Sequence, residues 1–147
     1  MTKRGQLCTF YVQGLLFGVE VERVQEVIRY QEMTRIPLSP AVIAGLINLR
    51  GQIVTAIELR HQLELPARGD AGLPMNVVIR RDDGPVSLLV DEIGDVVEVD
   101  AQLFEPAPPT LAARAREFIR GVYKLKEQLL LVLDTEKAMA VMDARAA

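Results

Sequence analysis

The sequence predicts a mostly β fold in which short strands form two groups. Apolar runs of about five residues recur along the 147 residues with turn signals between them, and half of all residues are hydrophobic. A stretch with two prolines and two glycines, Glu64 to Pro74, separates an earlier from a later series of runs. The length suits about one domain with a substantial core.

Nine strands are expected, each bounded by turn residues. The runs are rich in Val, Ile, Leu and Phe, the residues that suit a pleated, half-buried surface. Glycine or aspartate stands at most of the turns between them, as at Gln13-Gly14, Arg50-Gly51 and Asp83-Gly84. In chain order the expected strands are 7–12, 15–19, 44–49, 52–58, 76–80, 86–90, 95–99, 120–124 and 128–133.

Helical segments are few and short. Residues 21–28 have apolar side chains at 21, 24, 27 and 28, the three-then-four spacing of one helical face, and predict a short helix. One further turn is expected at 59–63 and another near 111–117, after a proline-rich stretch. Residues 135–142 predict a terminal helix with Thr135 as its N-cap.

Composition argues against several classes of partner. The formal net charge is only −3 and no basic stripe is present, so neither nucleic acid nor an anionic membrane surface is expected as a partner. The longest apolar runs, such as 129–133, are far shorter than the roughly 20 residues that cross a bilayer. The N-terminus has no signal-peptide pattern, and the single cysteine, Cys8, allows no internal disulfide. The expected location is cytoplasmic.

The sequence contains no recognisable set of catalytic or metal-binding residues. His61 is the only histidine and has no nucleophile, base and orienting group arranged around it. One histidine and one cysteine cannot complete a tetrahedral zinc site. Carboxylates such as Asp91 and Asp95 are interpreted as solvated strand-edge residues. No catalytic residue, metal or cofactor is therefore expected, and the rival hypothesis is a small ligand-binding or enzyme domain that uses these acids.

The most distinctive segment is Gly45-Leu46-Ile47-Asn48-Leu49-Arg50-Gly51, which leads into an apolar run. We interpret Gly45 and Gly51 as structural turn residues, because glycine tolerates a positive φ angle or a close backbone approach. Arg50 then lies at the turn between two strands, where its guanidinium can face a partner. This arrangement indicates a recognition corner more than a catalytic cleft.

These residues resemble the chemotaxis coupling proteins of the CheW family, and the resemblance covers roughly residues 8 to 142. The corner is accompanied, in order, by other segments similar to the family pattern. They are Phe10-Tyr11-Val12, Val24-Gln25-Glu26, Arg35-Ile36-Pro37, Leu88-Leu89-Val90-Asp91, Phe104-Glu105-Pro106 and Gly121-Val122. Any single segment is weak, whereas the ordered set is specific.

The resemblance implies a mostly β fold of two SH3-like, five-stranded β-barrel subdomains with short helices. We expect one domain over 1–147, with approximate subdomains 7–65 and 75–143, and leave open whether a terminal strand crosses between the barrels. It also implies a non-catalytic adaptor that couples chemoreceptor cytoplasmic tips to the regulatory domain of a CheA-type histidine kinase, in the cytoplasm beneath receptor arrays. The alternative is a coupling protein of a non-flagellar pathway that controls pili, gliding or a second messenger.

The resemblance further implies which residues contact the partners. In this numbering the segments that match the family's contact regions are Val24-Gln25-Glu26 and Asn48-Leu49-Arg50-Gly51. An ion pair between Glu26 and Arg50 is expected to order the corner. The expected partner-binding residues are Val24, Glu26, Asn48, Leu49, Arg50 and Gly51.

Overall fold

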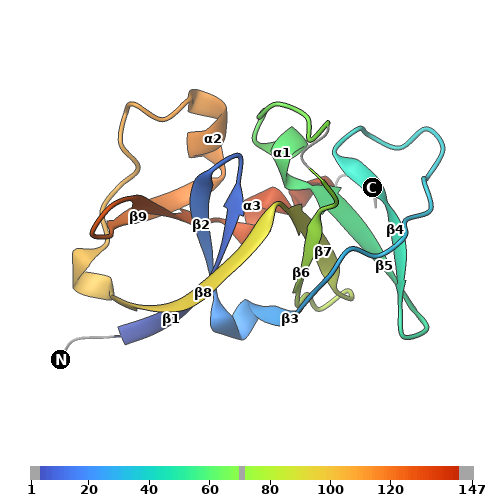
Figure 1. Ribbon diagram of the computed structural model, residues 1–147, viewed down its shortest axis with the longest axis horizontal. Helices are drawn as coiled ribbons and strands as arrows, with labels where there is room; N and C mark the ends of the chain where they lie inside the picture. Colours follow the sequence, from blue (N-terminus) through green and yellow to red (C-terminus); the bar gives the residue numbers. More distant parts are fainter. Residues whose placement is uncertain (1–3, 70–71, 143–147) are drawn as a thin grey trace.

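The computed structural model describes residues 4–69 and 72–142, which form two five-stranded sheets with a few short helices (Figure 1). The strand order in the first sheet is β8-β1-β2-β10-β9, and in the second it is β3-β6-β7-β5-β4. The expected mostly β fold of two five-stranded units is confirmed.

The elements follow one another with short connections. The strands are β1 (Arg4–Val12), β2 (Leu15–Glu20), β3 (Val24–Ile28), β4 (Ile43–Leu49), β5 (Gln52–Glu58), β6 (Met75–Ile79), β7 (Val86–Val90), β8 (Glu92–Asp100), β9 (Ile119–Lys124) and β10 (Leu129–Leu133). The α-helices are α1 (Leu59–Gln62), α2 (Ala113–Glu117) and α3 (Thr135–Ala138), and the 3-10 turns are η1 (Val21–Arg23) and η2 (Ala101–Leu103).

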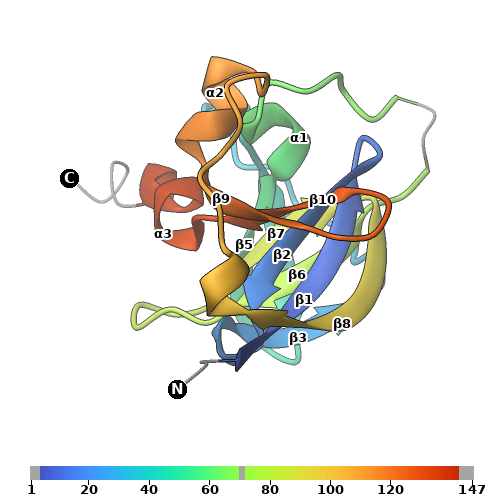
Figure 2. The same cartoon turned by 90° about the vertical axis from the view of Figure 1, so that its left-hand side faces the viewer.

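The two sheets do not divide the chain into an N-terminal and a C-terminal half. The first sheet combines β1 and β2 with β8, β9 and β10, because β2 pairs in parallel with β10 from the far end of the chain (Figure 2). The second sheet holds all the strands in between and has its own parallel pair, β5 with β7. The expected subdomains 7–65 and 75–143 therefore do not match the sheets. Strands from the later part of the chain, β8, β9 and β10, join β1 and β2 in the first sheet.

The helix predicted over 21–28 is wrong. Only η1 is helical, and residues 24–28 form β3, which pairs antiparallel with β6. The pairing register shifts between Val24 and Glu26, and such a bulge interrupts the two-residue alternation of a strand. The apolar spacing consequently imitates a helix, while the β-branched residues suit the strand that forms.

The other predicted helices occur where they were expected, with shorter bounds. The turn at 59–63 corresponds to α1, the segment near 111–117 to α2, and the terminal helix begins at Thr135. Its N-cap is Asp134, one residue before the predicted cap, and the Asp134 carboxylate accepts a hydrogen bond from the amide of Lys137 at 3.1 Å.

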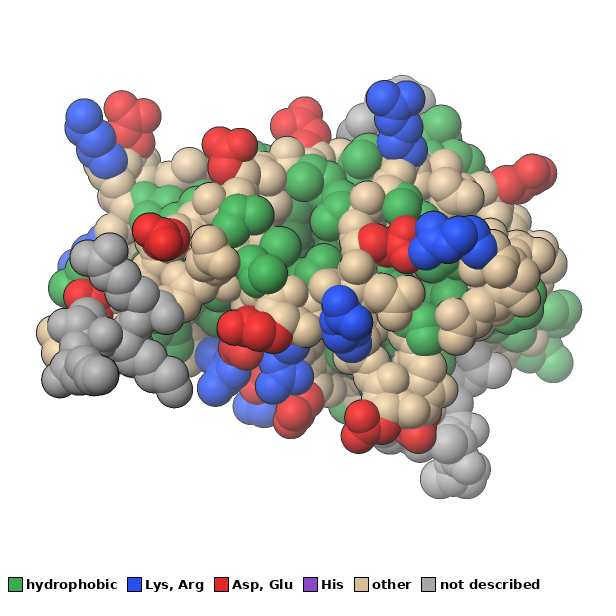
Figure 3. Space-filling view, turned by 90° about the horizontal axis from the view of Figure 1, so that it is seen from below, with side chains coloured by type: hydrophobic (Ala, Val, Ile, Leu, Met, Phe, Trp, Pro, Cys, Tyr) green, Lys and Arg blue, Asp and Glu red, His purple; other side chains and the backbone are tan. Residues whose placement is uncertain are grey.

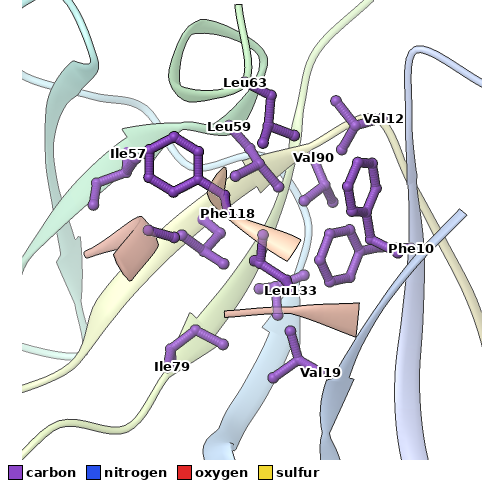
Figure 4. Packing of buried hydrophobic residues seen from close by; sticks show 14 of the residues in the cluster. Phe10, Val12, Val19, Ile57, Leu59, Leu63, Ile79, Val90, Phe118 and Leu133 are labelled. Atoms are coloured by element: carbon purple, nitrogen blue, oxygen red, sulfur yellow. The ribbon is translucent and has the colours of Figure 1, made fainter. Parts of the chain in front are cut away.

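The main core lies between the two sheets. Side chains of both sheets, including Phe10 and Val19 from the first and Ile79 and Val90 from the second, meet in one buried cluster (Figure 4). Phe118, the residue that directly follows α2, also belongs to this cluster. Two smaller apolar clusters lie on the opposite faces of the sheets, one per sheet. Because the main core is shared, the two sheets stabilise each other and form one packed unit.

Gly45 does not form a turn. It lies within β4, where a Cβ atom would stand 2.7 Å from the carbonyl oxygen of Thr34. Thr34 forms an isolated bridge with Leu46, through backbone hydrogen bonds of 2.8 Å in both directions. The glycine is therefore required for a close backbone approach, which was the other use of glycine considered for this segment.

Replacing Gly45 with alanine is expected to destabilise the protein by about 1–3 kcal/mol, the usual cost of forcing an extra methyl group into a packed site. The methyl group would have to displace the backbone of Thr34 and break its bridge to β4. Urea unfolding measures the loss. Gly5→Ala is the matched control, because a Cβ at Gly5, in β1, meets no atom within 4 Å. Equal stability of the two variants would contradict the close-approach role.

Candidate partner-binding site

The corner predicted from the sequence is a two-residue hairpin turn between β4 and β5. Leu49 pairs with Gln52, so Arg50 and Gly51 alone make the turn, with φ angles of 51° and 88°. Two positive φ angles are the geometry of a type I′ turn, which matches the twist of the strands it joins. The side-chain oxygen of Asn48 accepts a hydrogen bond from the amide of Gly51 at 2.8 Å. Gly51 is thus confirmed as a turn residue.

An ion pair joins this turn to β3. The Nη1 atom of Arg50 donates to Oε1 of Glu26 at 3.0 Å, and Nη2 donates to Oε2 in a second parallel contact. Hydrogen bonds from Arg50 hold the pKa of Glu26 below its ordinary value. Because β3 and β4 are the opposite edges of the second sheet, the pair connects the two edges where the sheet curls into a barrel.

The Arg50 side chain remains available to a partner although it is paired. It is 69% exposed, while that of Glu26 is 21% exposed. Ion pairs this exposed contribute little to stability, because water and salt screen them. The ion pair does, however, orient the Arg50 side chain, because a guanidinium bound by two hydrogen bonds to one carboxylate is held in one plane.

Exposed apolar side chains occur on the two strands next to the ion pair, β5, which follows the turn, and β3, which carries Glu26. Ile53, two residues after the turn, is 61% exposed, and Val27 of β3 is 37% exposed. Val24 is half-buried and packs against the main core. Viewed from the side of β3 and the β4–β5 turn, hydrophobic side chains gather in the middle of the face and charged side chains surround them (Figure 3). Such a surface suits a partner with one apolar face.

Leu49 does not belong to this exposed surface. Its side chain is only 7% exposed and packs in the apolar cluster of the second sheet with Ile47 and Val54. The prediction that Leu49 contacts a partner is corrected accordingly, because strand alternation directs it inward beside the outward-facing Asn48. Asn48, Arg50 and Gly51 are all exposed.

The sequence analysis missed a second group of charged residues at the junction between the sheets. Asp91 is the single residue between β7 and β8, where the chain passes from the second sheet to the first. It was interpreted as a solvated carboxylate, yet its side chain is only 17% exposed. Arg60 of α1 binds it with two hydrogen bonds, from Nε to Oδ1 at 3.0 Å and from Nη2 to Oδ2 at 2.7 Å.

Asp91 also binds the first sheet. Its carboxylate accepts the amide hydrogen of Gln13, in the β1–β2 turn, at 2.7 Å, and its own amide donates to the carbonyl of Tyr11 at 2.9 Å. Burial alone would raise the pKa of Asp91, but hydrogen bonds from Arg60, Gln13 and Arg68 outweigh it and hold the pKa below its ordinary value. An apolar strand followed by an aspartate was the only signal of this junction in the sequence.

Two further charges complete the group. Arg68 donates from Nη2 to both carboxylate oxygens of Glu58 at 2.9 Å and from Nη1 to Asp91. The two arginines and two carboxylates balance in charge, and every member has a partner, as buried charges require. Spacing along the chain gives no sign of this cluster, since its members come from β5, α1, the following loop and the β7–β8 junction.

The described residues offer little for catalysis or metal binding. Over 4–69 and 72–142, no group of three or more His, Cys, Asp or Glu side chains is placed to hold a metal ion. His61 is exposed on α1, and burial raises the pKa of the half-buried Cys8 thiol, which disfavours its reactive thiolate. None of the helices described in the structure has the length and apolar character needed to span a bilayer.

Two packed five-stranded sheets with a charged, exposed corner have the features of a protein-binding module. Comparison with known proteins gives the family: residues 6–142 match the model of the CheW-like domain. The chain belongs to the CheW family, whose members are scaffold and adaptor proteins of chemotaxis signalling. The resemblance noted in the sequence is thereby confirmed.

Relatives from distant bacteria support this assignment. The chain is 34% identical to the chemotaxis protein CheW of Klebsiella aerogenes, over 84% of this chain and 75% of the relative. It is 31% identical to that of Bacillus subtilis, over 94% of this chain and 86% of the relative. The crystal structure of the scaffolding protein TtCheW from Thermoanaerobacter tengcongensis superposes with a TM-score of 0.78 at 26% identity and covers 89% of both chains.

Proposed function

We propose that this protein is a non-catalytic adaptor that couples the cytoplasmic tips of chemoreceptors to the regulatory domain of a CheA-type histidine kinase. The observation that supports it most is the corner at Arg50, a charged turn held in one orientation by Glu26 beside exposed apolar side chains. In this proposal the protein acts in the cytoplasm and is recruited to membrane-attached receptor arrays through its partners.

The receptor-contacting surface consists of the exposed members of the predicted set with their apolar neighbours. An amphipathic helix would place its apolar stripe over Val27 and Ile53 and its polar edge against Arg50. Val24 and Glu26 support this surface from β3, and Asn48 and Gly51 fix the shape of the turn. The residues proposed to form the site are Val24, Glu26, Asn48, Arg50 and Gly51.

Calorimetry tests the coupling role directly. The purified protein is titrated with the regulatory domain of the histidine kinase from the same organism and then with a receptor cytoplasmic fragment. Saturable heats for both titrants, with the second retained in the presence of the first, are expected for an adaptor, which needs two separate binding surfaces. Absence of heat with every native kinase and receptor would overturn the proposal and favour a screen of metals and small molecules as ligands.

A further inference from the structure

The segment after α1 lies over the junction between the sheets with little apolar packing of its own. In residues 66–69, which we name the strap, Pro66, Ala67 and Gly69 are exposed, and only the side chain of Arg68 is largely covered. Leu65, just before the strap, packs against the main core and anchors its start. The position of the strap therefore depends on polar contacts.

Those polar contacts come from two arginines with different roles. Arg60 donates from Nη1 to the carbonyl oxygens of Pro66 at 3.0 Å and Ala67 at 3.3 Å. Arg68, whose side chain is 10% exposed, reaches inward from the strap to Glu58 and Asp91. Arg60 is part of α1, so it stays in place whether or not the strap is closed.

We propose that the strap is a releasable element of the fold and that the Arg68 ion pairs with Glu58 and Asp91 are its latch. Without Arg68, Asp91 keeps both hydrogen bonds from Arg60 and the one from the Gln13 amide. The connection between the sheets therefore persists when the latch opens. Opening leaves the two carboxylates, Glu58 and Asp91, with only one arginine, Arg60, to balance them. The resulting excess of negative charge attracts Arg68 and favours closure.

The latch also shapes a neighbouring cavity. Arg68 and Glu58 line a hollow of about 890 Å³ whose other walls include Leu38 and Leu73. Both leucines are strongly exposed, and Leu38 has a φ angle of 63°, which is unfavourable for a residue with a Cβ atom. When Arg68 leaves, the hollow loses part of its lining and becomes wider. Opening of the strap is thus a local change of surface shape, on the side of the molecule that carries α1 (Figure 1).

Trypsin reports the state of the latch because it must insert an arginine or lysine side chain into its own pocket. In the closed strap Arg68 is engaged and protected, whereas Arg116 of α2 is exposed and Arg60 is buried. Mass spectrometry of the early fragments gives three rates from one digestion. Cleavage after Arg68 reports latch opening, cleavage after Arg116 is the internal standard, and cleavage after Arg60 reports global unfolding.

Two variants release the latch and keep a trypsin site at position 68. Glu58→Gln removes the charge that the guanidinium binds, and Arg68→Lys removes the fork that bridges two carboxylates. Each is expected to speed cleavage after residue 68 about tenfold relative to cleavage after Arg116. Cleavage after Arg60 should stay slow, which shows that the fold is retained. Glu127→Gln, which alters an exposed carboxylate in the turn between β9 and β10, should leave all three rates unchanged.

Two results would overturn the proposal. One is cleavage of the unaltered protein after Arg68 as fast as after Arg116, because the strap would then be open already. The other is a rate after residue 68 that rises only together with cleavage after Arg60, because the ion pairs would then support the whole fold and not a separate strap. If Glu58→Gln fails to fold, Arg68→Lys still decides between these results. A rise in salt concentration is a further test, because salt screens the ion pairs of the latch in the unaltered chain.

Discussion

Replacement of Asp91 with alanine is expected to lower the free energy of unfolding by about 3 kcal/mol, the lower part of the range for breaking a buried ion pair. For a chain of this length the loss corresponds to a fall in Tm of about 10 °C. The reason is that Arg60, with a side chain only 7% exposed, would retain its charge without its main partner. The link from the junction to the Gln13 amide would be lost as well.

The effect has a defined dependence on pH. The pKa of Asp91 in the folded protein lies below its unfolded value near 3.9, so the carboxylate stabilises the fold fully above that value. As pH falls below about 4 and through the folded-state pKa, this contribution disappears. Urea unfolding at several pH values should therefore show a gap between the unaltered protein and Asp91→Ala that is constant near neutrality and narrows below pH 4.

Two further variants make the prediction specific. Asp95→Ala removes an exposed carboxylate from the same strand, β8, and is expected to change stability by less than about 0.5 kcal/mol. The double variant Arg60→Met with Asp91→Ala should be no less stable than Asp91→Ala alone, because it removes the unpaired charge along with its partner. Additive losses in the double variant would show that the two residues stabilise the fold independently.

Replacement of Arg50 with glutamate is expected to weaken binding of a receptor cytoplasmic fragment at least tenfold, while Tm changes by less than about 3 °C. Arg50 is 69% exposed and lies at a turn, so few folding contacts depend on it. The new carboxylate would repel Glu26 and reverse the charge offered to the partner. Calorimetry with the receptor fragment measures the affinity, and thermal unfolding measures the stability.

Arg116→Glu is the matched control, because α2 lies at the top of Figure 1 and the β4–β5 turn at the bottom. It makes the same change of charge and should leave receptor binding unaltered. The exchange variant Glu26→Arg with Arg50→Glu separates two causes of the loss. Recovery of binding would mean that the partner needs only an ordered turn, and no recovery would mean that it recognises the arginine itself. A large loss of Tm in Arg50→Glu would instead assign Arg50 to the structural framework.

The sequence itself predicted the features that depend on neighbouring residues. The Arg50-Gly51 turn follows from local backbone preference, and the positive φ angles at both positions confirm it. The strands on either side, β4 and β5, follow from their apolar runs. The ordered set of motifs also predicted the family, which the match over residues 6–142 confirms. The Glu26–Arg50 ion pair came from that resemblance and is present in the structure.

Only the tertiary structure decided the features that depend on strand pairing between distant parts of the chain. Residues 24–28 could satisfy a helical spacing, and the free edge of β6 is what makes them a strand. Alternation puts Leu49 and Asn48 on opposite faces of β4, but only the packing of the second sheet decided that the Leu49 face is the buried one. The parallel pairing of β2 with β10 joins an early and a late strand of the chain in one sheet, and no local signal encodes such a pairing.

The junction at Asp91 shows the same division most clearly. The sequence shows that a carboxylate follows an apolar strand, a pattern that is also typical of an exposed strand end. The fold decided that this position is the crossing between the sheets and brought Arg60, Arg68 and Gln13 to it from separate segments. A tight turn such as Arg50-Gly51 is specified by neighbours in the sequence, whereas a buried group of charges is specified by which distant residues meet when water is excluded.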